Sequence, residues 1–307
     1  MKFIKIISLL FVFLVSVNST AQQTPHYTQY MYNMSIINPA YAGARADVSA
    51  GLLGRKQWVG IDGAPETQTF SLNVRAFDGI GLGVSVIRDK IGLISSTDFN
   101  ADISYTVVIS SQSRLALGVK GGFTNFTNNL SQGITPDNDV NPDITGIYPN
   151  VGMGAFYYNT HFYAGVSVPQ LFKTPKYKLD NNQYAAGLND HMNYFATAGY
   201  VFDINEKVKF KPSTLIKIAS GLPLSVDINA NVLYDNLLEF GLSYRYNDSV
   251  SGMIGIQLYD KFRLGYSYDH TLTGLGNFND GSHEIMLLFD LDLEKRGRWL
   301  NDSSCYF

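Results

Sequence analysis

Runs of about ten residues in which every second side chain is apolar recur about fourteen times between residues 46 and 293, a period typical of β-strands. In the run 224–234 the even positions are all apolar or aromatic: Leu224, Val226, Ile228, Ala230, Val232 and Tyr234. Because a strand sends successive side chains to opposite faces, each run has one apolar and one polar face. The sequence therefore predicts an all-β chain, a transmembrane antiparallel β-barrel of about 14 strands.

The apolar faces of further runs are free of charge, which a lipid-facing surface requires. The runs 97–107, 238–246, 262–269 and 284–293 all place their Asp, Glu and Arg residues on the opposite face. A charged residue facing lipid near the midplane would cost about 2–4 kcal/mol. An exported β-sandwich or propeller remains the soluble alternative, but it would need fewer aromatic outer faces. Two runs, 46–55 and 191–202, alternate less clearly, and their facing stays open.

The lengths of the connections support the barrel independently. Tight turns are expected at alternate junctions: 76–79, 109–113, 158–161, 203–207, 234–237 and 258–262. The junctions between them are longer at 56–66, 89–97, 125–149, 169–190 and 270–282, and short at 219–223 and 247–249. Outer-membrane barrels have short periplasmic turns and longer external loops. The pattern therefore predicts the outer membrane of a Gram-negative bacterium, with membrane lipid around the barrel.

Three segments lie outside the expected barrel (46–293). Residues 1–21 have the charged start, short apolar stretch and small final residues of an export signal. The segment 22–45 does not alternate, and it is either a plug in the lumen or a periplasmic segment that packs on a partner. The segment 294–307 is expected to be a periplasmic tail. Their aromatic residues are candidate partner-binding anchors: Tyr27, Tyr30, Tyr32, Trp299, Tyr306 and Phe307.

The inward faces of the expected strands carry charges of both signs. One strand turns Lys209, Lys211 and Lys217 inward, and its neighbour turns Asp227, Asn229 and Asn231 inward. These rows form either a self-neutralised wall or a selectivity ladder for an anionic solute. Several inward positions are glycines that leave room for a plug or bound segment close to the wall: Gly81, Gly83, Gly118, Gly122, Gly241 and Gly265.

Catalytic and metal-binding patterns are weak in this sequence. The five histidines have no fixed spacing to a serine and an acid, so we expect neither an enzyme nor a cofactor. The weak metal candidates Asp137, Asp139, Asn141 and Asp143 alternate like the start of a calcium loop, although Pro142 replaces the required glycine. Removal of Lys2 and Lys5 with the signal would change the formal net charge from −3 to −5, which argues against a nucleic-acid partner.

Three stretches of the chain resemble a known family. The sequences HYTQYMYNMSIINPAYAG (26–43), RKQWVGIDGAPETQTFS (55–71) and VIRDKIGLISSTDFNADISYTV (86–107) are similar to the PorP/SprF family of type IX secretion system membrane proteins. The closing pair Tyr306-Phe307 is similar as well, whereas the family more often has a basic residue where Cys305 stands. The resemblance implies an outer-membrane barrel that works with the type IX machinery of protein-secreting, often gliding, bacteria.

The leading hypothesis from the resemblance is a component needed for secretion or surface anchoring of large adhesin-like proteins. It would bind their C-terminal domain and contact periplasmic ring components of the secretion system. The alternative is a 14-stranded channel or transporter for small or hydrophobic solutes. Trp58 lies in or near the first external loop, either as an aromatic of the membrane interface or as a further partner-binding candidate. Whether the chain serves the core apparatus or one dedicated adhesin stays open.

Overall fold

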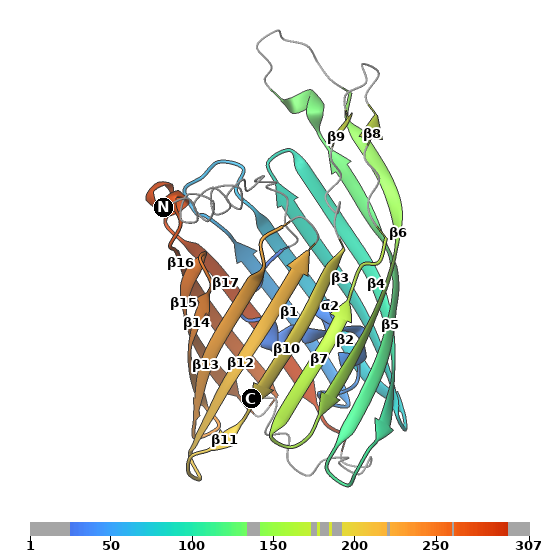
Figure 1. Cartoon of the computed structure of the whole chain (residues 1–307), viewed down its shortest axis with the longest axis vertical. Coiled ribbons are helices and arrows are strands. Elements are labelled where there is room, and N and C mark those ends of the chain that lie inside the picture. Colours follow the sequence, from blue (N-terminus) through green and yellow to red (C-terminus); the bar gives the residue numbers. More distant parts are fainter. Residues whose placement is uncertain are drawn as a thin grey trace, which may run out of the picture.

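The chain forms a closed antiparallel β-barrel (Figure 1). The computed structural model describes residues 25–133, 142–172, 177–178, 184–185, 192–219, 222–259 and 261–293. Within them the barrel wall is made by fourteen strands: β1 (Val48–Lys56), β2 (Glu66–Phe77), β3 (Ile80–Ile91), β4 (Ile94–Val108), β5 (Arg114–Asn128), β6 (Ile144–Tyr158), β7 (Phe162–Val168), β10 (Asn193–Tyr200), β12 (Val208–Ala219), β13 (Ser225–Tyr234), β14 (Leu238–Arg245), β15 (Ser249–Leu258), β16 (Phe262–Thr271) and β17 (Ser282–Leu291).

Closure follows from the pairing of strands that are distant in the chain. Strand β1 pairs with both β2 and β17, and β10 pairs with both β7 and β12, so the ring has no open edge. Strand β11 (Phe202–Asp203) continues β10 past Val201 and pairs with β12. The two-residue strands β8 (Tyr177–Lys178) and β9 (Tyr184–Ala185) pair only with each other among the described residues. The prediction of a barrel of about 14 strands is confirmed.

The predicted faces of the strands are confirmed as well. On β4 the residues Phe99, Ile103 and Tyr105 are exposed on the outside, while Asp98 and Asp102 are buried on the inside. The same alternation holds on β13, β14, β16 and β17. Strand β1, whose facing the sequence left open, turns its leucine at 52 outward and Arg55 inward. The barrel therefore presents hydrocarbon to lipid and polar groups to its lumen.

The six tight turns all occur at one end of the barrel, which the rule for outer-membrane barrels makes the periplasmic end. The prediction of an external loop at 89–97 is wrong. The stretch 89–97 is not a loop, because β3 continues to Ile91 and β4 resumes at Ile94 after a two-residue turn in which Gly92 has φ 57°. Asp89 pairs with Ser96 and Ile91 with Ile94, so the strand ladder continues up to the turn. Strands β3 to β6 form a raised part of the external rim (Figure 1).

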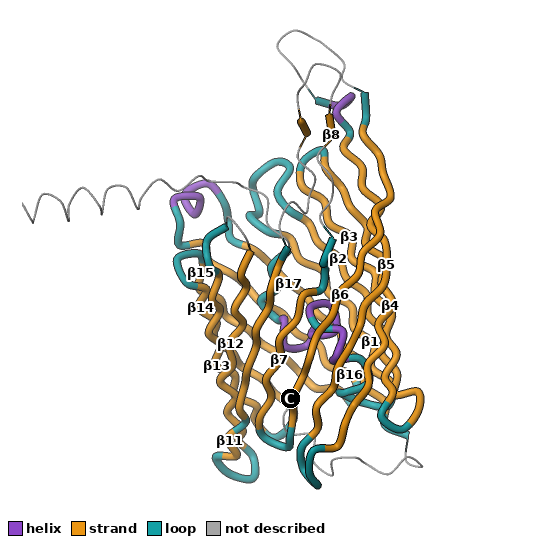
Figure 2. The backbone as a smooth tube through the Cα atoms, turned by 45° about the vertical axis from the view of Figure 1, so that its right-hand side comes forward, coloured by secondary structure: helices purple, strands orange, loops and turns teal. Residues whose placement is uncertain are grey.

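The described part of the N-terminal segment lies inside the barrel (Figure 2). It contains three short helical turns, η1 (Tyr30–Tyr32), α2 (Met34–Ile37) and η2 (Pro39–Tyr41), whose residues are all buried. Asn38 caps η2 by accepting a hydrogen bond from the Ala40 N–H at 3.0 Å. No helix in the described ranges is long and apolar enough to span a bilayer. Residues 1–21 and 294–307 lie outside the described residues.

The closed wall gives a first testable expectation. We expect the purified protein to migrate at different apparent sizes on a detergent gel before and after boiling, because the hydrogen-bonded ring resists unfolding by detergent alone. Identical mobility of both samples, together with full solubility in the absence of detergent, would contradict the barrel.

Candidate functional site

The lumen is occupied by residues 25–47, called the lumen segment below. Its path runs from the external half of the barrel to the periplasmic end, where it enters β1. Near the external side Thr28 is bonded to β16 and β17, and near the periplasmic side Arg45 pairs with Asp290 at 2.8 Å. Burial and Asp290 act in opposite directions on the pKa of Arg45, and the net effect raises it, so this guanidinium stays charged.

A buried cluster of charges fixes the external part of the lumen segment. The carboxylate of Glu284 is fully buried and accepts hydrogen bonds from the backbone N–H groups of Thr28 at 3.0 Å and Gln29 at 2.8 Å. Arg55 lies 2.6 Å from Asp269 and 3.3 Å from Glu284, and the Thr28 hydroxyl donates to Asp269 at 2.8 Å. One cation of the wall thus balances two carboxylates that also hold the segment.

The tyrosines of the lumen segment are bonded to the wall. The Tyr30 hydroxyl donates to Ser213 at 3.3 Å and accepts from the Asn229 side-chain amide at 3.0 Å. The Tyr32 hydroxyl donates to Glu239, and Arg263 lies over the Tyr32 ring at 5.2 Å. Burial raises the pKa of both phenols. Tyr27 is buried too, so all three candidate anchors are enclosed in the barrel.

On the opposite half of the barrel, side chains of the wall satisfy the backbone of the short helices. Lys120 on β5 donates to the carbonyls of Ser35 at 3.3 Å and Ile36 at 3.1 Å, and Ser167 donates to the carbonyl of Ile37 at 2.9 Å. Such terminal carbonyls have no partner within a helix this short. Their capture by β5 and β7 explains why a segment with little intrinsic helical stability is held in one conformation.

Glycines bring the lumen segment close to the wall at three positions that the sequence indicated. A Cβ at Gly81 would overlap the backbone of Ala42, one at Gly118 would overlap Pro39 and Ala40, and one at Gly265 would overlap the Gln29 side chain. At two other indicated positions, 122 and 241, the close atoms belong to the wall itself. Gly154, which the sequence analysis missed, approaches the Asn38 side chain in the same way.

The close approach of Gly118 to Pro39 and Ala40 predicts that one added methyl group will destabilise the protein at this position. We expect Gly118→Ala to lower the free energy of unfolding by about 1–3 kcal/mol, the usual cost of overpacking, because the backbone of the segment must move. The matched control is Gly121→Ala on the same strand, where a Cβ would meet nothing within 4 Å. Urea titrations followed by gel mobility give both values. Equal stability of the two variants would show that the segment is not packed against β5.

The inward charges are paired partly within the wall and partly with the lumen segment. Asp227 is bound by Arg245 of β14 through contacts of 2.8 and 2.9 Å. Lys211 lies over the Tyr32 ring at 5.4 Å. Nζ of Lys217 lies within hydrogen-bond distance, 3.0 Å, of Nε2 of His26. The inward lysines Lys211 and Lys217 of β12 therefore contact the lumen segment.

His26 lies among cations, which has a consequence for pH dependence. Burial, Lys217 of β12, Arg245 of β14 and Arg55 of β1 all lower its pKa well below 6.5. The docked segment therefore binds His26 in its neutral form. As the pH falls below 6.5, the undocked segment takes up a proton that the docked one does not, and docking is weakened.

We therefore expect the loss of unfolding free energy between pH 7.5 and 5.5 to be about 1 kcal/mol smaller in His26→Gln than in the unaltered protein. The glutamine side chain can still accept from Lys217 but does not titrate. Denaturant titrations of both proteins at the two pH values provide the comparison. The same pH dependence in both would mean that His26 does not titrate on release of the segment.

The remaining candidates from the sequence lie at the external loops or outside the described residues. Trp58 is half-buried in the loop between β1 and β2 and has a φ of 48°. Its backbone N–H donates to the Ser282 hydroxyl at 3.1 Å. Asp143 accepts hydrogen bonds from the Ser131 side chain and, at 2.9 Å, from the Ser131 backbone N–H, and these bonds lower its pKa. No group of three or more possible metal ligands is present among the described residues. The candidates outside the described ranges are Asp137, Asp139, Asn141, Trp299, Tyr306 and Phe307.

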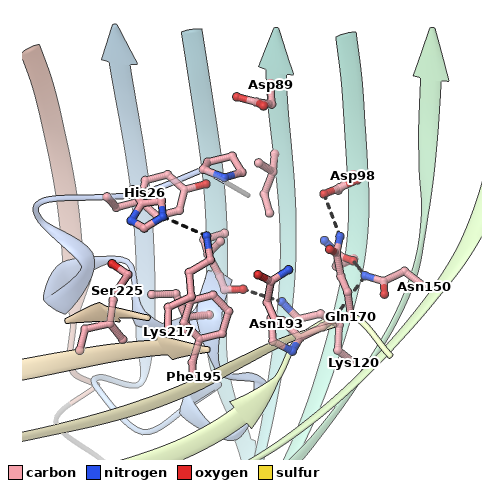
Figure 3. Close-up of a pocket in the computed structure, with 18 of the residues that line it drawn as sticks. His26, Asp89, Asp98, Lys120, Asn150, Gln170, Asn193, Phe195, Lys217 and Ser225 are labelled. Carbon is pink, nitrogen blue, oxygen red and sulfur yellow. Dashed lines mark hydrogen bonds between the residues drawn. The ribbon is translucent and has the colours of Figure 1, made fainter. Parts of the chain in front are cut away.

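A cavity lies between the lumen segment and the external ends of the strands. It encloses about 980 Å³ of space not filled by atoms, part of which is open to solvent. Its lining includes Asp89 on β3, Asp98 on β4, Phe195 on β10 and Lys217 on β12, with His26 and Ile36 from the segment (Figure 3). The sequence analysis missed this cavity, because Asp89 lay in an expected loop.

A closed 14-stranded wall with a largely apolar outer face and an occupied polar lumen defines an outer-membrane β-barrel protein. The family model described as "Type IX secretion system membrane protein PorP/SprF" matches residues 19–289. The chain belongs to this family, which confirms the resemblance of the motifs and places the protein in the outer membrane of a Gram-negative bacterium as a component of that secretion system. Among curated proteins there is no significant match.

Three solved structures with similar folds are distant in sequence. The structure titled "CymD monoaromatic hydrocarbon channel" is 10% identical over 90% of this chain and 96% of that chain, with a TM-score of 0.54. Omp33 of Acinetobacter baumannii is 9% identical over 81% and 100%, with a TM-score of 0.49. The toluene transporter TbuX of Ralstonia pickettii is 10% identical over 89% and 96%, with a TM-score of 0.47. At these identities the likeness shows the barrel fold alone.

Proposed function

We propose that this barrel retains large secreted surface proteins at the outer membrane by binding their C-terminal domain, and that it does not conduct them. Membership of the type IX family supplies the secretion context. The observation that carries the proposal is the occupied lumen, since residues 27 to 44 are buried in it almost without exception. A folded domain cannot pass a wall of this strand number, even when it is empty.

The wall contacts of the lumen segment support a stable obstruction. The segment is bonded to strands all round the ring: β1, β2, β4, β5, β6, β7, β12, β13, β14, β16 and β17. Many of these hydrogen bonds have a charged donor or acceptor, and such bonds are stronger than those between neutral groups. Release of the segment would expose several uncompensated charges at once. We infer that the lumen stays occupied while the barrel works.

A retained protein then binds at the external surface, and the periplasmic apparatus binds at the turn end. The external mouth offers the raised strands β3 to β6, the loop with Trp58 and the cavity above the lumen segment. The periplasmic end is near Leu293, after which the tail with Trp299, Tyr306 and Phe307 follows. No catalytic group is required for either contact, in agreement with a protein that is not an enzyme.

Deletion of the gene tests the proposal. We expect one or a few large proteins to be lost from the cell surface, while uptake of small solutes and most other secretion continue. Surface proteomics of the deletion strain and of a complemented strain provides the measurement. A defect limited to the uptake of a hydrophobic nutrient, with every surface protein present, would instead support the alternative, a channel for small or hydrophobic solutes.

A further inference from the structure

Two carboxylates line the external cavity on neighbouring strands. In the register of β3 and β4, Asp89 pairs with Ser96 and Asp98 pairs with Ile87, so the two acids are diagonal neighbours on the inner face. Diagonal neighbours are about 7–8 Å apart, close enough for one cation to contact both carboxylates. Their relative exposures are only 6% and 9%. Figure 3 shows both side chains at the cavity, on one side of the view.

Neither carboxylate forms a salt bridge in the described part of the chain, although the charge of Lys120 acts on Asp98 at longer range. Asp89 accepts from the Thr67 hydroxyl at 2.6 Å, and Oδ2 of Asp98 accepts from Gln170 at 3.4 Å. Oδ1 of Asp98 is buried without a hydrogen-bond partner. Lys120 lines the same cavity, but it is paired with Asp102 at 3.6 Å and bonded to the lumen segment. Two buried carboxylates that form no salt bridge are costly in their charged form unless a ligand supplies a cation.

The lining beside the acids contains isoleucines as well as polar side chains such as Ser96 and Gln170. Ile87 lies between them in the register, and Ile36 and Ile37 of the lumen segment complete this part of the lining. The cations of the cavity lining are Lys120 on β5 and Lys217 on β12, and Figure 3 shows Lys217 bonded to the neutral imidazole of His26. The acidic side therefore suits a group with an aliphatic stem and a cationic end. Lysine and arginine side chains have this form.

We propose that this cavity binds a lysine or arginine side chain of an extracellular polypeptide, with its cation between Asp89 and Asp98 and its stem against the isoleucines. The choice of a polypeptide over a small amine rests on the proposed function, since a retained surface protein would reach the barrel from this side. The site would make the cavity a specificity pocket for the retained protein.

Peptide binding to the detergent-solubilised full chain tests the site. The probes are acetyl-Leu-Gly-Lys-Gly-Leu-amide and the same peptide with norleucine in place of lysine, which keeps the stem and removes the charge. We expect the lysine peptide to bind more tightly by roughly tenfold, the scale of one charge-assisted hydrogen bond. Asp89→Asn with Asp98→Asn should abolish this preference. Both asparagines can still accept from Thr67 and Gln170, and boiling gels check that the barrel forms.

The matched control is Asp62→Asn, which removes an exposed carboxylate of the external loop between β1 and β2 and should leave the preference unchanged. The single variant Asp98→Asn should give an intermediate loss if the double variant fails to fold. Equal binding of both peptides by the unaltered protein, or an unchanged preference in the variants, overturns the site. Tighter binding of free cadaverine than of the lysine peptide overturns the polypeptide ligand. If gene deletion still removes surface proteins in these cases, the proposed function stands without this pocket.

Discussion

Removal of residues 26–42 is expected to convert a nearly silent protein into a conducting one. In planar bilayers the intact chain should show low and unsteady conductance, because the lumen segment fills the middle of the barrel. The deletion should raise the conductance roughly tenfold or more, since barrels with somewhat higher strand numbers already enclose aqueous channels. Arg45 and Asp47 remain, so their contacts with Asp290 and Arg75 still fix the start of β1.

The control for this deletion replaces 26–42 by a glycine-serine stretch of equal length, which keeps the connection but removes the bonds to the wall. It should also conduct, although with more noise from the mobile chain. Large and stable channels in the intact protein would contradict the obstruction and favour the solute-channel alternative. Boiling gels of each variant establish that the barrel is formed before its conductance is compared.

Loss of the Glu284 carboxylate should have the largest effect of any single substitution on stability. Glu284→Ala leaves two backbone N–H groups of the lumen segment without a partner and removes one of the two carboxylates paired with Arg55. Breaking such a buried pair costs about 3–5 kcal/mol. Glu284→Gln keeps an acceptor and removes the charge, so its loss should be smaller. Urea titrations monitored by gel mobility measure both.

The matched control is Glu66→Ala at the exposed start of β2, which has the same chemical change outside the lumen. Surface substitutions of this kind usually change stability by no more than about 0.5 kcal/mol. Similar values for the substitutions at 66 and 284 would mean that the carboxylate of Glu284 does not hold the segment. A stable Glu284→Ala protein whose residues 26–44 have become sensitive to protease would show instead that the segment and the wall unfold separately.

The strands could be predicted from the sequence because membrane strands have two separate solvents on their two faces. Each exposed apolar residue on β4, such as Phe99 or Ile103, alternates with a buried polar residue, and this period of two is visible without any tertiary information. The tight turns could be predicted for the same reason, since they lie where this alternation is interrupted. The turn at Gly92 was missed because Asp89 and Ser96 are polar residues of an extended hairpin, and polarity there resembles that of a loop.

The position of the lumen segment could not be predicted, because its contacts are made with every part of the ring. Local sequence gives residues 30–41 weak helical turns and no alternation, so it leaves a plug and a periplasmic segment equally consistent with the pattern. Only the closed barrel brings Glu284, Glu239 and Lys120 to the same segment from distant strands. Glycines such as Gly118 were the one local signal, since their small size marks a close approach.

To predict the external cavity, the register of β3 and β4 must be known as well as the face to which each side chain points. Asp98 was recognised as inward, but Asp89 was assigned to a loop, and so the pair was not recognised. Their diagonal relation appears only once Ile87 is placed opposite Asp98. A useful signal in similar sequences is an inward acid on each of two consecutive strands with no lysine or arginine at the facing positions.

A photo-crosslinking amino acid placed at Trp58 in living cells tests the central claim that the barrel holds a secreted protein at its external mouth. Trp58 lies in the external loop next to Ser282, whereas Leu242 on β14 is 71% exposed on the lipid-facing wall and serves as the control position. Position 58 should crosslink to peptides from the C-terminal domain of a large surface protein, and position 242 should not. Crosslinks to no protein at position 58, in cells that display their full set of surface proteins, would contradict the claim.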